Sequence, residues 1–342
     1  MSVLKISLIC AAIFCAVPSF AQVGTPANAT VAQGVNAVGS QKVTFNNNGI
    51  RMVGNLYLPA GYDSKKKYPA IVVSHPWAGV KEQTSGLYAQ QLARQGFVTL
   101  AFDASHYGES GGEPRFLEDP AARVQDIRSA VGYLANLPQV DANRIGAVGV
   151  CAGGGYTLHE AQTDLRVKAV AGVVAYDIGD AARTGIEGAP VTADDRQKLL
   201  LGVAAQLNKE AAGDPVLLQG LLPPLDQVDA STGNFIREAT DYYLTPRGQH
   251  PNSISRMVVT SPGLHFAYYP FDHLELVSPR PVLLIAGERA ETRKFSEAAY
   301  AKARQPKELM IVPGASHFDL YDKPQYVTPA VNKLAEFFAK HL

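Results

Sequence analysis

The stretch from Arg144 to Tyr156 (RIGAVGVCAGGGY) constrains the fold more than any other part of the chain. Its first half is an apolar run typical of a buried strand, and its second half can begin a helix. Gly149 and Gly153 flank Cys151, so a sharp turn can present the thiol at the tip of the strand, where the helix N-terminus favours a thiolate. The pattern therefore predicts a nucleophilic Cys151 on a strand–turn–helix element, against the alternative of an inert buried cysteine.

The N-terminal residues 1–21 have the pattern of a secretory signal peptide. One positive charge precedes the apolar run Ile6–Val17, and small residues at Ser19 and Ala21 predict cleavage before Gln22. The alternative is a retained membrane anchor, for which the run is short. We therefore expect an exported protein, secreted or periplasmic, without stable membrane insertion.

The other two cysteines, Cys10 and Cys15, lie in this segment, so its removal leaves Cys151 as the only thiol and excludes an internal disulfide.

The 31 basic and 31 acidic residues balance, and this excludes the basic field that recruits nucleic acid or anionic membranes. The expected partner is a small molecule, with the oligomeric state left open. The hydrophobic fraction of 46% is that of a globular protein.

Strands and helices alternate along residues 41–342, which predicts an α/β fold with a mostly parallel sheet flanked by helices. Residues 22–40 are small and polar, and we expect a flexible lead-in there. Strands are expected at 41–45, 50–58, 70–74, 97–102, 144–150, 167–176, 281–286 and 308–312, and helices at 84–95, 121–137 and 326–342.

The alternation stops between about residues 178 and 276, which is longer than a crossover helix requires. Helical patterns occupy Thr192–Glu210 and Val216–Leu222, and no strand pattern stands out. We interpret this insertion as a mainly helical cap over the active site. The alternative is an excursion on a distant surface.

A cysteine nucleophile needs a base, and His317 follows the last predicted strand and a glycine turn. An acid that orients the imidazole is expected after the preceding strand, where Glu291 lies further into the loop than Glu288. Asp177 is a third candidate, because it follows the strand that comes after the helix beginning at Cys151. Glu291 is the preferred acid, with Glu288 and Asp177 as alternatives.

Two backbone N–H groups are expected to form an oxyanion hole. One belongs to Ala152, directly after the nucleophile. The other follows the strand 70–74, where Pro76 has no N–H and Trp77 is therefore the donor. His75 and His106 also follow strands, and we expect them at the rim of the pocket.

From Gln41 onward the chain resembles the α/β-hydrolase superfamily, and the elbow cysteine resembles the cysteine-nucleophile branch typified by dienelactone hydrolase. The segments His75–Gln83 and Phe102–Gly112 look more like a capped group related to X-Pro dipeptidyl peptidases and polyketide transferases. The resemblance implies a Cys151–His317–acid triad with the two oxyanion donors above. That group usually has Asp as the acid, and dienelactone hydrolase has a far shorter insertion.

The predicted function is hydrolysis of a carboxylic ester, lactone or thioester through an acyl-thioester at Cys151. An acyltransferase with the same triad is one alternative, and a non-catalytic binding protein of the same fold is another. No metal is implied, since His and Cys residues show no ligand spacing. No nucleotide cofactor is implied, since Gly153–Gly155 lacks the phosphate-loop and dinucleotide patterns.

Overall fold

The computed structural model describes residues 39–187 and 190–342, so the predicted signal peptide and nearly all of the lead-in lie outside the described residues. The strands are β1 Ser40–Asn47, β2 Ile50–Tyr57, β3 Tyr68–Ser74, β4 Val98–Asp103, β5 Val140–Val150, β6 Val167–Val173, β7 Leu218–Gly220, β8 Arg256–Val258, β9 Val282–Gly287 and β10 Lys307–Val312. The α-helices are α1 Thr84–Arg94, α2 Pro120–Ala135, α3 Ala152–Ala161, α4 Ile178–Thr184, α5 Ala193–Ala211, α6 Asn234–Leu244, α7 Ser261–Phe266, α8 Arg293–Lys302, α9 Asp319–Asp322 and α10 Pro324–His341. Two 3₁₀ helices are η1 Leu225–Gln227 and η2 Leu274–Val277.

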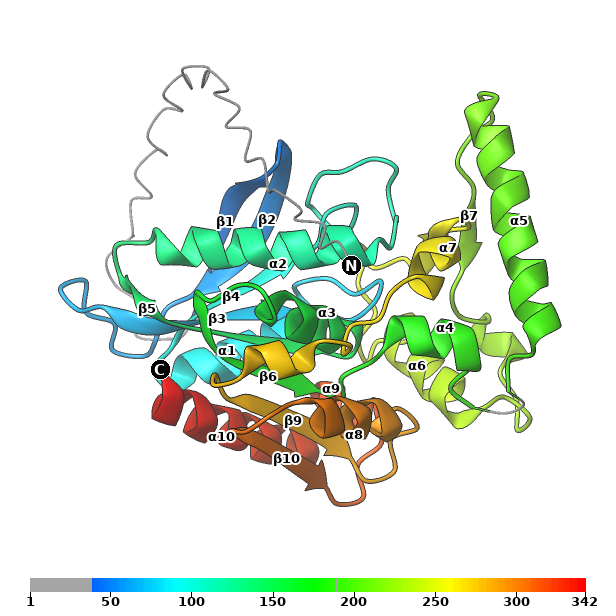
Figure 1. Ribbon diagram of the computed structural model, residues 1–342. Helices are drawn as coiled ribbons and strands as arrows, with labels where there is room; N and C mark the ends of the chain where they lie inside the picture. The colour runs from blue at the N-terminus through cyan, green and yellow to red at the C-terminus, as the bar shows by residue number, and fades with distance from the viewer. Residues whose placement is uncertain (1–38, 188–189) are drawn as a thin grey trace, which may run out of the picture. The chain divides into compact units, whose positions relative to one another are not determined.

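Eight strands form one sheet in the order β1-β2-β4-β3-β5-β6-β9-β10 (Figure 1). β1 pairs antiparallel with β2, and β2 antiparallel with β4, whereas all the other neighbours are parallel. The central strands are buried on both faces, as their continuous apolar runs indicate. The predicted mostly parallel α/β sheet is confirmed.

Helices cover both faces of this sheet. α1 packs with α10 on one face, whereas α2 packs with α3 on the other (Figure 1). η2 contacts both α3 and α8, which places α8 on the face of α3. Within residues 39–187 and 190–342, no helix is both long and apolar enough to span a membrane.

Local signals set where the long helices begin. The Asp119 side chain accepts a hydrogen bond from the Ala121 N–H, and Pro120 takes the first helical position of α2, where its missing N–H costs nothing. α5 begins at a capping box in which the Thr192 and Asp195 side chains bond each other's backbone N–H groups.

The insertion differs from the expectation in one element. The apolar run 216–222 was predicted to be helical, but it contains β7, which pairs antiparallel with β8. A short apolar run fits a strand as well as a helix, and its partner lies almost 40 residues later in the sequence, so local periodicity cannot decide. The predicted helix over 192–210 corresponds to α5, which lies beside α7 (Figure 1).

The carboxyl ends of the parallel strands lie at one edge of the sheet, and the residues that follow them gather there. Trp77 follows β3, Cys151 follows β5, Asp177 follows β6, Thr292 follows β9 and His317 follows β10. Topology alone therefore gives this edge a thiol, an imidazole and several polar neighbours.

We predict that the buried Glu160 of α3 destabilises the fold at alkaline pH. Both its carboxyl oxygens are buried without a hydrogen-bond partner among the described residues, and Arg128 Nε lies 3.6 Å away. Burial and the neighbouring Asp164 raise the pKa of Glu160 from 4.5 to about 9. Because the folded pKa exceeds the unfolded one, Glu160 takes nothing from the free energy of unfolding below pH 4.5, where it is protonated in both states. That free energy then falls as the pH rises toward 9.

Glu160→Gln should therefore raise the free energy of unfolding by about 1–3 kcal/mol at pH 8, and by much less at pH 5. Denaturant unfolding at both pH values measures this, with the exposed Glu336→Gln as the matched control. An equal effect of the two substitutions at pH 8 would contradict the prediction.

Candidate active site

Cys151 lies in a sharp turn between β5 and α3, at φ 57° and ψ −127°. A non-glycine residue rarely adopts a positive φ, and such strain persists only where surrounding structure imposes it. A Cβ on Gly149 would collide with the carbonyl of Gly153, and a Cβ on Gly153 would lie 2.6 Å from the carbonyl oxygens of Ser74 and His75. The two glycines are therefore required for the turn that places the thiol at the strand end.

The thiol is buried in a mixed environment. Desolvation raises the pKa of Cys151 from 9.0 to about 11, although three hydrogen-bond donors act against it. These are the Tyr321 hydroxyl and the backbone N–H groups of Ala152 and Trp77. Both backbone donors named from the sequence thus approach the sulfur, and the resting thiol is protonated at neutral pH.

Buried ionic contacts hold the loop that carries Trp77. Arg123 donates to the His75 carbonyl oxygen at 2.6 Å, and it also pairs with the buried Glu118 at 3.2 Å. On the other side of Trp77, the Lys81 ammonium lies 2.8 Å from Asp103. Buried pairs of this kind fix geometry, because breaking one leaves an uncompensated charge.

His317 is fully buried, and its two ring nitrogens face hydroxyl groups. Nδ1 lies 2.5 Å from Thr292 Oγ1, and Nε2 lies 3.2 Å from the Tyr321 hydroxyl. Phe235 and Phe318 pack against the ring, with centroids at 5.1 and 4.8 Å. Desolvation lowers the pKa of His317 from 6.5 to about 3, so the resting imidazole is neutral.

The structure differs from the expectation at the orienting acid. The Glu291 carboxylate accepts a hydrogen bond from Asn234 at 2.6 Å, and Thr292, the next residue, occupies the position against Nδ1. Consecutive residues point in different directions as the chain enters α8, so a one-residue offset redirects the carboxylate toward the insertion.

The two alternative acids are also engaged elsewhere. Glu288 is exposed and accepts a hydrogen bond from the Gly314 N–H at 2.7 Å. Asp177 caps α4 by accepting from the Asp180 N–H at 2.8 Å, and burial raises its pKa to about 6. Neither carboxylate has a hydrogen bond to the imidazole among the described residues.

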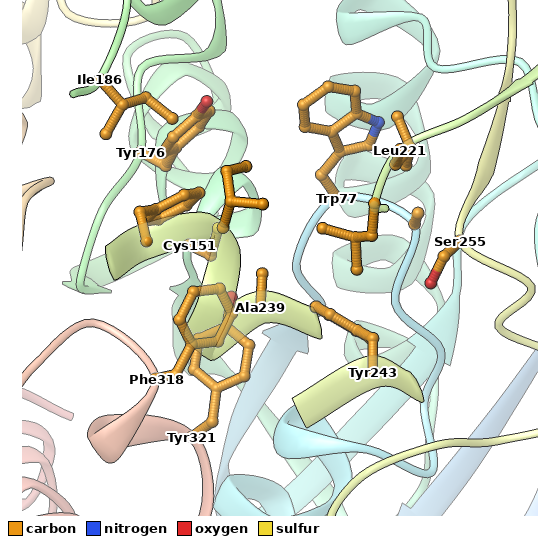
Figure 2. Close-up of a pocket in the computed structure, with 14 residues that line it drawn as sticks. Trp77, Cys151, Tyr176, Ile186, Leu221, Ala239, Tyr243, Ser255, Phe318 and Tyr321 are labelled. Atoms are coloured by element: carbon orange, nitrogen blue, oxygen red, sulfur yellow. The ribbon is translucent and has the colours of Figure 1, made fainter. Parts of the chain in front are cut away.

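A pocket lies over the thiol (Figure 2). Its lining from the main domain is Trp77, Ala78, Cys151, Tyr176, Phe318 and Tyr321, and its lining from the insertion is Ile186, Leu221, Leu222, Phe235, Ile236, Ala239, Tyr243 and Ser255. The insertion therefore supplies more than half of the wall, in keeping with a cap. No charged side chain is present in it.

His75 and His106, expected at the pocket rim, are not part of this lining. Nε2 of His75 accepts from the Ala104 N–H at 3.0 Å, and Nδ1 of His106 lies 2.9 Å from the Pro114 carbonyl oxygen. Both histidines support loops.

Within the described ranges, no group of three or more His, Cys, Asp or Glu side chains is arranged to hold a metal ion.

Sequence reasoning missed Thr292 and Tyr321. Tyr321 lies in α9, four residues after His317, and a spacing of four residues around a helical turn can bring two side chains together. That spacing is visible in the sequence. The role of Thr292 has no comparable signal, because a threonine beside a glutamate is not distinctive.

Comparison with known proteins gives consistent results. The model of the family described as "Dienelactone hydrolase family" matches residues 55–183. The uncharacterized protein PA2218 of Pseudomonas aeruginosa is 43% identical over 307 residues, covering 88% of this chain and 81% of the relative. The uncharacterized protein YcjY of Escherichia coli is 40% identical, covering 89% and 99%.

The crystal structure of PA2218 superposes with a TM-score of 0.84 at 40% identity, covering 94% of this chain and 99% of that one. A more distant relative, the thiohydrolase aneE of Aspergillus aculeatus, is 27% identical over 253 residues, which are 70% of this chain and 74% of the relative. These proteins share most of their length with the chain.

We predict that Thr292, rather than Glu291, fixes the imidazole tautomer of His317. Thr292→Val keeps the side-chain shape but leaves Nδ1–H buried without an acceptor, which should cost roughly 1–3 kcal/mol of unfolding free energy. Glu291→Gln should leave both stability and tautomer unchanged. Thermal unfolding and ¹⁵N chemical shifts of the imidazole measure the two effects, and a tautomer change in Glu291→Gln alone would restore the carboxylate as the orienting group.

Proposed function

The chain belongs to the dienelactone hydrolase family of α/β-hydrolases, and on that premise we propose that it hydrolyses a carboxylic ester, lactone or thioester. The observation that carries the proposal is the position of the Cys151 thiol. It lies at the nucleophile elbow, faces the pocket, and has the N–H groups of Ala152 and Trp77 beside it.

In the proposed mechanism Cys151 attacks the carbonyl carbon, and the two N–H groups stabilise the oxyanion that forms. Because the thiol pKa is raised to about 11 and the imidazole pKa is lowered to about 3, no ion pair exists beforehand. The thiol proton therefore leaves as the C–S bond forms, and His317 receives it. His317 then protonates the leaving alkoxide or thiolate and later activates a water that releases the acid.

The pocket supports an uncharged substrate with an apolar acyl group. Its aromatic and aliphatic walls offer no partner for a charge, and burying an unpaired charge there is costly. The thiohydrolase relative supports inclusion of thioesters among the substrates.

Catalysis can be tested by the turnover of p-nitrophenyl esters and acyl thioesters of increasing chain length. Wild type should turn over neutral medium-length acyl groups, whereas Cys151→Ala and His317→Ala should each lose at least about 10³-fold in kcat. Intact mass spectrometry should detect an acyl adduct on the wild type and none on Cys151→Ala.

Equal turnover in all three proteins, with no adduct, would contradict the Cys151 mechanism and favour a binding role. If added alcohols or amines capture most of the acyl group as transfer products, the acyltransferase alternative replaces hydrolysis. Arg128→Ala provides a matched control, because this partly exposed side chain lies outside the pocket lining.

Export of the protein can be tested separately. The N-terminal pattern supports cleavage before Gln22, so protein recovered from outside the cytoplasm should begin at Gln22. Intact mass of the protein from periplasmic and culture fractions measures this, and Ala21→Arg should block the cleavage. A protein of full length in the cytoplasmic fraction alone would contradict the export proposal.

A further inference from the structure

The Tyr321 hydroxyl is the shared neighbour of the two groups that must exchange a proton. It lies 3.2 Å from His317 Nε2, and it lines the same pocket as Cys151, near enough to the sulfur to lower the pKa of the thiol. Among the residues that the structure describes, the hydrogen-bond partner of Nε2 is this hydroxyl and not the thiol. Figure 2 shows the Tyr321 side chain directed from α9 toward Cys151, beside Phe318.

Hydrogen-bond capacity assigns a direction to each contact. A phenol has one donor and two acceptor lone pairs, so the Tyr321 hydroxyl can donate to the imidazole and accept from another neighbour. In the tautomer with the proton on Nδ1, facing Thr292 Oγ1, Nε2 accepts the hydrogen bond of the Tyr321 hydroxyl. The lone pairs of the Tyr321 oxygen are then free to accept the proton of the Cys151 thiol.

We propose that the Tyr321 hydroxyl relays the thiol proton of Cys151 to His317 Nε2, and is thereby a catalytic residue of the site. The inference rests on the proposed function, since it requires Cys151 to be the nucleophile and His317 the base.

The step balances without any further reactant. The S–H bond breaks and its proton bonds to the Tyr321 oxygen, while the Tyr321 O–H proton bonds to Nε2. The electron pair of the S–H bond becomes the new C–S bond to the substrate carbonyl. The phenol is neutral before and after, as its buried position and strongly raised pKa require, so the two transfers are concerted. When the leaving group departs, the Nε2–H proton bonds to the Tyr321 oxygen while the Tyr321 O–H proton bonds to the leaving alkoxide or thiolate, so the phenol is again neutral.

The surroundings favour this path over solvent. His317 is fully buried, and Phe235, Phe318 and Tyr321 pack around its ring. A hydroxyl held on both sides is pre-oriented, whereas a water would have to be ordered at each turnover.

The experiment compares the full chain with Tyr321→Phe, which deletes only the hydroxyl. We expect kcat to fall by about 10²-fold with KM changed less than about threefold, because general acid–base steps contribute on that scale. Alkylation of Cys151 by iodoacetamide at pH 8, followed by peptide mass spectrometry, should slow about tenfold, because the ionised sulfur loses the hydroxyl that stabilises it and the thiol pKa rises. Thermal unfolding shows that the variant is folded.

Tyr88→Phe is the matched control, because the buried Tyr88 hydroxyl donates to the Leu320 carbonyl oxygen at 2.8 Å, next to Tyr321. It removes a buried hydroxyl that supports α9 without touching the thiol or the imidazole. The relay predicts wild-type alkylation and a kcat within about threefold for Tyr88→Phe. Equal losses in Tyr88→Phe and Tyr321→Phe would assign the effect to support of α9 and overturn the relay.

A solvent-isotope measurement on the wild type is independent of any substitution. Two protons in flight predict a curved dependence of the acylation rate on the deuterium fraction, whereas a straight line would overturn the relay. If Cys151→Ala abolishes turnover and Tyr321→Phe does not reduce it, the relay alone fails. If Cys151→Ala retains wild-type turnover, the proposed function fails, and the relay fails together with it.

Discussion

Desolvation of the Cys151 thiol and the His317 imidazole is the constraint on which the rest of the site depends. Burial raises the pKa of the thiol to about 11 and lowers that of the imidazole to about 3, so both groups are neutral at rest. Their neighbours are neutral as well, namely the hydroxyls of Thr292 and Tyr321. A permanent carboxylate against the imidazole would stabilise its cation, but it would also add a buried charge to an apolar pocket.

The charges lie behind the loop that carries Trp77 instead of in the pocket. Arg123 fixes one end of this loop through the His75 carbonyl, and Lys81 fixes the other through Asp103. The Trp77 N–H is therefore held beside the thiol by rigid contacts. Preorganised donors cost no reorganisation when negative charge develops on the substrate, which suits a site whose nucleophile is not ionised beforehand.

Local rules predicted the parts of the fold and site that local geometry determines. The elbow glycines, the buried strands and the position of His317 after β10 all follow from spacing and strand order. The partner of His317 did not follow, because a one-residue offset after β9 decides whether Glu291 or Thr292 meets the ring. β7 was missed for a related reason, since its pairing partner is distant in the sequence.

The insertion contributes to the chemistry as well as to the walls, and α6 shows why. Asn234 at its start binds the Glu291 carboxylate, and Phe235 packs on the imidazole. Tyr243 near its end lines the pocket and packs edge-on against the Tyr321 ring. One helix therefore desolvates the base, supports the hydroxyl network and shapes the acyl site. A change in α6 that alters the acyl group accepted will also alter the protonation energies of the thiol and imidazole, so selectivity and reactivity are coupled through this helix.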